Sequence, residues 1–288
     1  MSLKEKYINP FTDFGFKKLF GEEPNKDLLI DFLNQILPQH HQITELTYTS
    51  TEKLGISEID RKAIFDLYCT SKSGEKFIVE MQKAKQNYFK DRSVFYSTFP
   101  IQEQAPKGVW DFKLAAVYLV GILDFVFDED KKEQEVLHEI KLKNQHGEVF
   151  YDKLTLIYLE MPNFNKSEDE IETNFDKWLY VLKNLPYLEA KPKKLQEKVF
   201  QKLFKTAEIA KFNREEVLQY EQSLKVYRDL KNVIDTAFDD GKAEGRNEEK
   251  LERITLMLRK RKLSVEEIAD IFEVTTQFVG KIKAELNL

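Results

Sequence analysis

The chain has 288 residues, a net charge of −5 and 42% hydrophobic residues. This length and composition predict one large globular domain or two smaller ones, and they exclude a protein that coats nucleic acid through bulk positive charge. The charges balance over residues 1–123, and the acidic excess lies in residues 124–240. A locally basic surface remains compatible with this distribution.

No apolar run approaches the roughly 18 residues that a membrane-spanning helix needs. Residues 1–6 lack the apolar stretch of a signal peptide. The single cysteine, Cys69, allows no internal disulfide and is interpreted as a small core residue. We therefore expect a cytoplasmic protein with no membrane partner.

The N-terminal region predicts helix followed by strand. Residues 13–37 hold two groups of apolar side chains, and the second group has the three- and four-residue spacing of an amphipathic helix that ends before Pro38. Residues 45–53 alternate loosely between polar and apolar, which predicts a weak first strand.

Two short apolar runs, residues 63–69 and 76–82, each carry an acid in their interior. Both runs are rich in β-branched and aromatic residues, which predicts a strand for each. The polar residues 70–75 between them predict a turn, so the three segments together predict a hairpin.

The acids in these two runs are Asp66 and Glu80. Alternation along a strand places Glu80 and Gln82 on one face and directs apolar residues of both runs to the other face, into a core. These apolar residues are Phe65, Leu67, Phe77, Val79 and Met81. A carboxylate in an apolar strand is costly unless something pairs with it, so two on adjacent strands suggest a divalent cation. The alternative is a salt bridge with Lys62 or Lys76.

The next segments predict the remainder of an α/β core. Helical spacing of aromatic residues predicts a helix over residues 84–99, and the continuous apolar run 114–123 predicts a strand buried on both faces. Two further apolar runs within residues 136–160, separated by the polar residues 144–148, predict a second hairpin that extends the sheet.

After Pro162 the pattern becomes helical. Amphipathic spacing predicts helices over residues 169–184, 193–211 and 215–238. The apolar stripe of the last helix is interpreted as packing onto the core, and docking of a partner helix is the alternative. Gly241 and Gly245 are expected to break this helix before another one over residues 247–262.

The last residues predict a pair of short helices. Ser264 is the expected N-cap of the first and forms a capping box with Glu267, and residues 276–286 form the second. The apolar spacing fits a helix-turn-helix pattern, with Glu273 at the turn position that glycine often occupies. DNA contact and a helical hairpin used for packing or dimerisation are both compatible with this pattern.

An Asp on one strand followed by Glu80-Met81-Gln82 at the end of the next resembles the metal motif of the PD-(D/E)XK nucleases. Within that superfamily the chain is similar to the branch of PD-(D/E)XK transposases or recombination-promoting (Rpn) nucleases. Residues 9–21, NPFTDFGFKKLFG, match the opening segment of this branch, and residues 29–34, LIDFLN, continue the match. The resemblance covers roughly the first 165 residues.

This resemblance implies an α/β, restriction-endonuclease-like mixed-sheet core with an all-α C-terminal extension. We expect a nuclease-like domain in residues 1–165, a helical extension in 166–240 and a C-terminal helical module of helix-turn-helix type in 241–288.

The resemblance also implies Mg²⁺-dependent endonucleolytic hydrolysis of DNA, linked to recombination or mobile elements. The implied ligands of Mg²⁺, or of Mn²⁺ as a substitute, are Asp66, Glu80 and the backbone carbonyl of Met81. Gln82 is the third implied catalytic residue and stands where most of the superfamily has lysine. A glutamine orients water but adds no positive charge. The Rpn-type branch shares this glutamine.

Other polar residues are weaker candidates for the site. Asp13 is expected either to approach the metal from the first helix or to cap that helix. Arg92, on the helix after the second strand, is expected to meet a phosphate or solvent. Lys83 is not assigned the role of the missing lysine, because a continued strand directs it to the opposite face. The four histidines lack metal-ligand spacing and are interpreted as surface residues: His40, His41, His138 and His146.

Two other functions are compatible with the sequence. A non-catalytic DNA-binding or regulatory protein would retain the nuclease fold, and Gln82 motivates this alternative. An interaction protein would act through a partner, as the long helix 215–238 and the acidic middle suggest. DNA is the expected partner of the nuclease, and a homodimer through the C-terminal helices is a further expectation.

Overall fold

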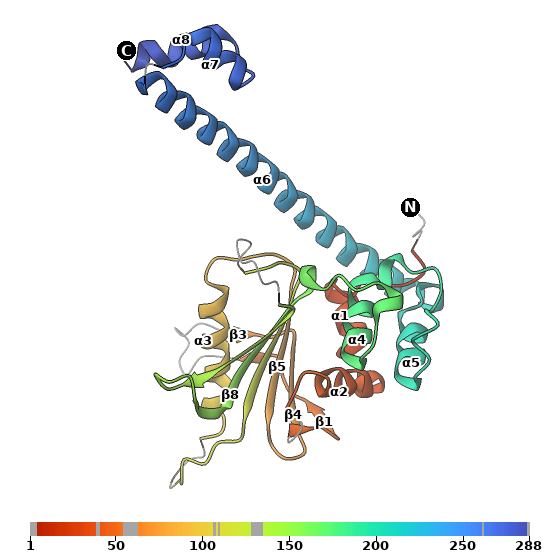
Figure 1. Cartoon of the computed structure of the whole chain (residues 1–288). Helices are drawn as coiled ribbons and strands as arrows, with labels where there is room; N and C mark the ends of the chain where they lie inside the picture. The colour runs from red at the N-terminus through yellow and green to blue at the C-terminus, as the bar shows by residue number, and fades with distance from the viewer. Residues whose placement is uncertain are drawn as a thin grey trace. The chain divides into compact units, whose positions relative to one another are not determined.

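The computed structural model describes residues 5–38, 41–53, 63–105, 108, 110–127, 135–260 and 262–286. Contacts divide the chain into an N-terminal unit, Met1–Asp229, and a C-terminal unit, Leu230–Leu288. The N-terminal unit holds a β-sheet with the helices that pack on it, and the C-terminal unit is helical (Figure 1). The domain boundaries expected near residues 165 and 240 remain predictions.

A six-stranded mixed sheet forms the centre of the N-terminal unit. Its strands are β1 (Leu46–Tyr48), β4 (Leu67–Ser71), β5 (Lys76–Gln82), β6 (Val117–Leu123), β7 (Leu137–Lys143) and β8 (Val149–Glu160). They lie in the order β1-β4-β5-β6-β8-β7, with β5, β6 and β8 parallel and the other neighbours antiparallel. The short strands β2 (Glu52–Lys53) and β3 (Ala63–Ile64) pair separately. Both predicted hairpins, β4–β5 and β7–β8, are present.

Helices cover both faces of this sheet (Figure 1). The helices are α1 (Asp13–Phe20), α2 (Lys26–Asn34), α3 (Phe89–Gln102), α4 (Asn174–Asn184) and α5 (Lys198–Ala207). On one face α3 packs over a smaller apolar cluster that includes Ile78 and Phe89. On the other face the remaining helices pack in a larger cluster with Phe77 and Cys69, which is fully buried as predicted. Because both faces are covered, all of β6 is buried, as its continuous apolar run predicts.

The helix α6 (Arg214–Lys260) is continuous over 47 residues, so the predicted break at Gly241 and Gly245 is wrong. A glycine costs an exposed helix only about 1 kcal/mol, which neighbouring helix formers offset. Of the predicted stripe, Leu224 and Tyr227 pack onto the core, together with Tyr220. Most of the stripe is exposed, including Leu218, Val233 and Phe238, so its interpretation as core packing is wrong beyond the first turns. Within the described residues no helix is both long enough and apolar enough to cross a membrane.

The C-terminal unit ends in α7 (Val265–Ile271) and α8 (Thr276–Glu285), which pack on the end of α6 through a small apolar cluster. The predicted capping box is confirmed. The Ser264 hydroxyl accepts from the Glu267 N–H at 3.1 Å, and the Glu267 carboxylate accepts from the Ser264 N–H at 2.7 Å. Glu273 has φ of +50°, the left-handed conformation expected at the turn. DNA contact by this pair of helices remains a prediction.

The start of α1 is fixed by a tight loop around Gly15. The Thr12 hydroxyl accepts from the Gly15 N–H at 2.9 Å and donates to the Asn9 carbonyl at 2.8 Å. A Cβ on Gly15 would lie 2.1 Å from that carbonyl oxygen, so only glycine fits here. This loop sets the position of Asp13, the first residue of α1.

We predict that Gly15→Ala lowers the free energy of unfolding by about 3 kcal/mol, because the added methyl group must displace backbone and a buried cap. Gly241→Ala is the matched control. A Cβ there meets nothing within 4 Å in an exposed helix, so it should stabilise the protein by about 0.5–1 kcal/mol. Chemical denaturation measures both variants, and equal effects would contradict the account of the loop.

Candidate active site

The first acidic run does not form one strand. Phe65 and Asp66 form a bend between β3 and β4, and the chain leaves β5 there because the Phe65 N–H donates to the Thr51 carbonyl at 2.9 Å. The prediction that Phe65 and Leu67 share a face is therefore wrong. Phe65 packs beneath α3, and Leu67 packs in the larger cluster on the opposite face of the sheet.

At this bend Asp66 and Glu80 each bind the other's strand. The Asp66 N–H donates to Glu80 Oε1 at 3.2 Å, and the Met81 N–H donates to Asp66 Oδ2 at 2.8 Å. In an uninterrupted ladder Met81 would exchange both backbone hydrogen bonds with Phe65. Since the Phe65 N–H donates to Thr51 instead, the Met81 carbonyl loses its ladder donor beside the two carboxylates.

The strand β5 has the alternation that the sequence predicts. Phe77, Val79 and Met81 pack in the larger apolar cluster. Glu80 lies on the side of α3 with only 7% of its surface exposed. The carboxylate is therefore held inside the protein by the strand that carries it.

Burial, followed by the negative charge of Asp66, raises the pKa of Glu80 to about 8. Burial also raises the pKa of Asp66. In the described part of the chain no lysine or arginine forms an ion pair with either carboxylate. Lys76, one of the expected partners, donates to Thr70 Oγ1 at 3.0 Å, and Lys62 lies outside the described residues. Near neutral pH the pair therefore holds a proton or requires a cation.

Two lysines, Lys17 and Lys83, lie close enough to act on the charge of Asp66. Lys83 Nζ lies 2.6 Å from Asp13 Oδ1, and the charges of Lys17 and Lys83 both oppose the upward shift of the Asp66 pKa. Lys83 follows the last residue of β5 and pairs with Asp13 of α1, which packs on the sheet face opposite α3, so it lies on the opposite face from Gln82 as expected. The sequence signal for Lys17 is its position one helical turn after Asp13.

Arg92 binds the residue that replaces the superfamily's lysine. Its Nη2 donates to Gln82 Oε1 at 2.6 Å. The guanidinium rests on the rings of Phe89 and Tyr96, at 5.0 and 5.7 Å from their centres. The charge of Arg92 also opposes the rise in the Glu80 pKa. The helix α3 thus holds the positive charge of Arg92 beside Gln82.

A hollow of about 660 Å³ opens next to Asp66. Asp13 and Lys17 line it from α1, and Gln222 and Ser223 line it from α6. The volume is ample for a phosphate group and its neighbours, and Lys17 supplies a positive charge on the wall.

The described residues contain no group of three or more His, Cys, Asp or Glu side chains that would hold a metal ion. The bend nevertheless brings the carboxylates of Asp66 and Glu80 onto backbone N–H groups of Asp66 and Met81. The Met81 carbonyl, which has no donor from Phe65, is a third oxygen of this segment. Mg²⁺ prefers oxygen ligands, and one or two protein carboxylates suffice because it keeps several waters. The missing counter-charge and the missing ladder donor both fit such an ion.

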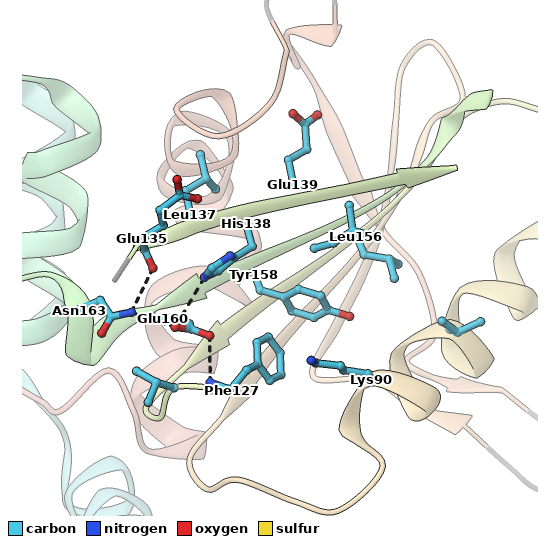
Figure 2. Close-up of a pocket in the computed structure, with 13 residues that line it drawn as sticks. Lys90, Phe127, Glu135, Leu137, His138, Glu139, Leu156, Tyr158, Glu160 and Asn163 are labelled. Atoms are coloured by element: carbon cyan, nitrogen blue, oxygen red, sulfur yellow. Dashed lines mark hydrogen bonds and ion pairs between the residues drawn. The ribbon is translucent and has the colours of Figure 1, made fainter. Parts of the chain in front are cut away.

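A second cavity, of about 480 Å³, lies between α3 and the strands β7 and β8 (Figure 2). The Glu160 carboxylate, 5% exposed, accepts from the Phe127 N–H and from Asn163 Nδ2, each at 2.9 Å. His138 Nε2 lies 3.5 Å from the same carboxylate. Glu160 thus fixes two loops at the end of β8. Its sequence position, at the end of an apolar run, gives no sign of these partners.

The histidines differ from one another in their surroundings. His146 is exposed, as predicted. His138 and His41 are partly buried, so their interpretation as surface residues is wrong. His40 lies outside the described residues.

Comparison with known families matches residues 10–237 to the family described as PD-(D/E)XK nuclease family transposase. This match spans most of the chain, and the chain belongs to that family. The resemblance read from the first 165 residues is confirmed and extends into α6, and the α/β class with a mixed sheet and C-terminal helices is confirmed with it. No curated protein and no solved structure matches the chain. The roles of individual site residues remain predictions.

We predict that the metal-free protein loses stability as the pH rises from about 4.5 to about 8. The unfolded chain releases the Glu80 proton near pH 4.5, whereas the folded protein retains it to about pH 8, so folding becomes less favourable across this window. Glu80→Gln should flatten this dependence and raise Tm at pH 8, by about 2–4 °C for each kcal/mol recovered.

Thermal melts in EDTA between pH 5 and 8.5 measure this effect. Glu75→Gln is the control, because the pKa of Glu75 is lowered, with Ser71 donating to its carboxylate, and its loss should not raise Tm at pH 8. Parallel pH profiles for wild type and Glu80→Gln would contradict the assignment.

Proposed function

We propose that this chain is a Mg²⁺-dependent DNA endonuclease that hydrolyses phosphodiester bonds in recombination or in the movement of mobile elements. The observation that supports this most is the pair Asp66 and Glu80. Both carboxylates have raised pKa values and no ion-pair partner among the described residues, and the Asp66 carboxylate accepts from the Met81 N–H. Membership of a nuclease family supplies the reaction class.

Asp66, Glu80 and the Met81 carbonyl would hold the ion, with Mn²⁺ as a substitute for Mg²⁺. When bound, the ion stabilises negative charge on the phosphate and lowers the pKa of water. The protein fixes the positions of its ligands before the ion binds, because each carboxylate already accepts a backbone N–H of the neighbouring strand.

Gln82 is suited to orient the attacking water. Its Nε2 donates to the Ala84 carbonyl at 3.1 Å and its Oε1 accepts from Arg92, so the amide is held in one orientation. The remaining lone pair of Oε1 can accept from water. Arg92 supplies the positive charge that glutamine lacks, close to where charge develops on the phosphate.

Lys17 and Lys83 are the expected contacts to the DNA backbone beside Asp66. Lys17 lines the hollow, and Lys83 is held by Asp13 at its edge. Ammonium groups bind phosphates as point charges without reading sequence.

We predict that Asp66→Asn and Glu80→Gln each reduce nicking of supercoiled plasmid in Mg²⁺ by roughly 10³-fold, because each removes a charged ligand. Asp91→Asn, an exposed acid on α3, is the control and should nick at the wild-type rate. Wild-type rates in either site variant, with Mg²⁺ required, would rule out this site.

We predict that Arg92→Ala lowers kcat for nicking by about 10–100-fold with little change in KM, because Arg92 acts next to the reacting centre. Arg92→Lys should retain part of the rate. Lys90→Ala removes an exposed positive charge from the same helix and is the matched control. Equal losses in Arg92→Ala and Lys90→Ala would show that only the net charge of α3 matters.

A non-catalytic DNA-binding protein with a nuclease fold is the second candidate. The engagement of the Gln82 amide by both Arg92 and Ala84 favours it, because this amide has fewer free positions for water. DNA binding by wild type without nicking in Mg²⁺ or Mn²⁺, unchanged in Asp66→Asn, would establish this alternative.

A further inference from the structure

The strand β7 forms an outer edge of the sheet, and it carries exposed apolar side chains. Within the described chain no strand pairs with its outer side. Ile140 is 43% exposed and Leu142 is 51% exposed, and Phe150 on the neighbouring β8 is 81% exposed. An open edge with apolar side chains is a template for another strand.

The register of β7 on β8 identifies which of its backbone groups point outward. The Glu160 N–H donates to the Val136 carbonyl at 2.8 Å, which makes these two residues a hydrogen-bonded pair of the antiparallel ladder. Hydrogen-bonded and non-hydrogen-bonded pairs alternate, so every second residue of β7 directs its N–H and C=O away from β8. The outward residues are Leu137, Glu139 and Lys141. A register shift follows Lys141, and the assignment ends there.

The charges on this edge are complementary to a second copy of the same edge. A two-fold axis at Ile140 places Glu139 of one copy opposite Lys141 of the other, and symmetry repeats this pair. Both residues are outward, so each pair would be hydrogen-bonded, and Ile140 would face its own copy in the closer, non-hydrogen-bonded arrangement. Figure 2 shows Glu139 on the opposite side of β7 from His138, on a face apart from the cavity's polar cluster.

Neighbouring registers are unfavourable. Moving the axis to Glu139 sets two glutamates against each other, and moving it to Lys141 sets two lysines against each other. Like charges directly opposite destabilise a strand pair. In a register whose two-fold axis falls between two residues, each outward N–H and C=O of one copy lies opposite a residue whose groups point inward, so the ladder hydrogen bonds are lost. Lysine on an edge normally discourages pairing, but in this one register each lysine meets an acid.

We propose that two copies of this chain associate by antiparallel pairing of their β7 edges about a two-fold axis at Ile140, which joins the two sheets into one. Within a single chain Lys141 Nζ already lies 2.5 Å from Glu139 Oε1, so both side chains are placed along this edge. The proposal does not depend on nuclease activity, and its test uses no DNA.

Sedimentation velocity of the full chain, from about 1 to about 200 µM, tests this interface. Wild type should form dimers as the concentration rises. Glu139→Lys and Lys141→Glu should each raise the dimer dissociation constant at least tenfold, because both symmetry-related pairs become like-charged. An equimolar mixture of the two variants should dimerise again, and so should the double variant with both charges exchanged.

A second pair of variants separates this edge from the C-terminal helices. Ile140→Asp sets two carboxylates against each other at the axis and should give monomers. Val233→Asp changes an exposed residue of α6 and should leave the dimer intact. Circular dichroism confirms that each variant is folded. A monomeric wild type at every concentration, a dimer indifferent to both charge reversals, or a dimer lost in Val233→Asp instead would each overturn the proposal.

Discussion

The candidate site depends on one electrostatic constraint: two neighbouring carboxylates are buried in an apolar sheet with no counter-ion among the described residues. Asp66 and Glu80 are brought together because β4 begins at a bend, and each accepts an N–H from the other's strand. The pKa of Glu80 near 8 expresses the cost of this arrangement. A fold that keeps such a pair needs something to compensate it, and a divalent cation does so with the ligands present.

The surrounding residues hold positive charge near this pair without neutralising it directly. Arg92 reaches it through Gln82, and Lys83 through Asp13. Both cations are therefore kept in place by a partner and remain outside ion-pair distance of the buried acids. This arrangement suits a polyanionic substrate, because a phosphate that enters the hollow meets positive charge while the carboxylates stay free for the metal ion.

Much of the fold follows from local patterns in the sequence. The burial of β6, the alternation of β5 and the capping box at Ser264 were all predicted, because each depends on residues close in the chain. The bend at Phe65 was not, because it is made by a hydrogen bond to Thr51, which lies 14 residues earlier, just before β2. The continuity of α6 through Gly241 was not, because the penalty of one glycine is smaller than the stability of the helix around it.

In the site, too, local patterns were predicted from the sequence, whereas contacts between distant parts of the chain were not. The motif identified Asp66, Glu80, Met81 and Gln82, and the structure links Asp66 to Glu80 and Met81 at the bend. Their roles remain predictions. The side of Lys83 followed from alternation, but its ion pair with Asp13 did not, because Asp13 lies 70 residues earlier in the chain. The Phe127 N–H that binds Glu160 lies 33 residues earlier in the chain, so only the sheet topology reveals this contact.

Calorimetric titration of the metal-free protein with Mn²⁺ at pH 7 tests the central claim most directly. Repeating it in buffers of different ionisation enthalpy measures the protons released on binding. The account predicts that wild type binds the ion and releases close to one proton, and that Glu80→Gln binds weakly and releases none. Equal affinity and equal proton release in the two proteins would contradict a metal site built on this pair.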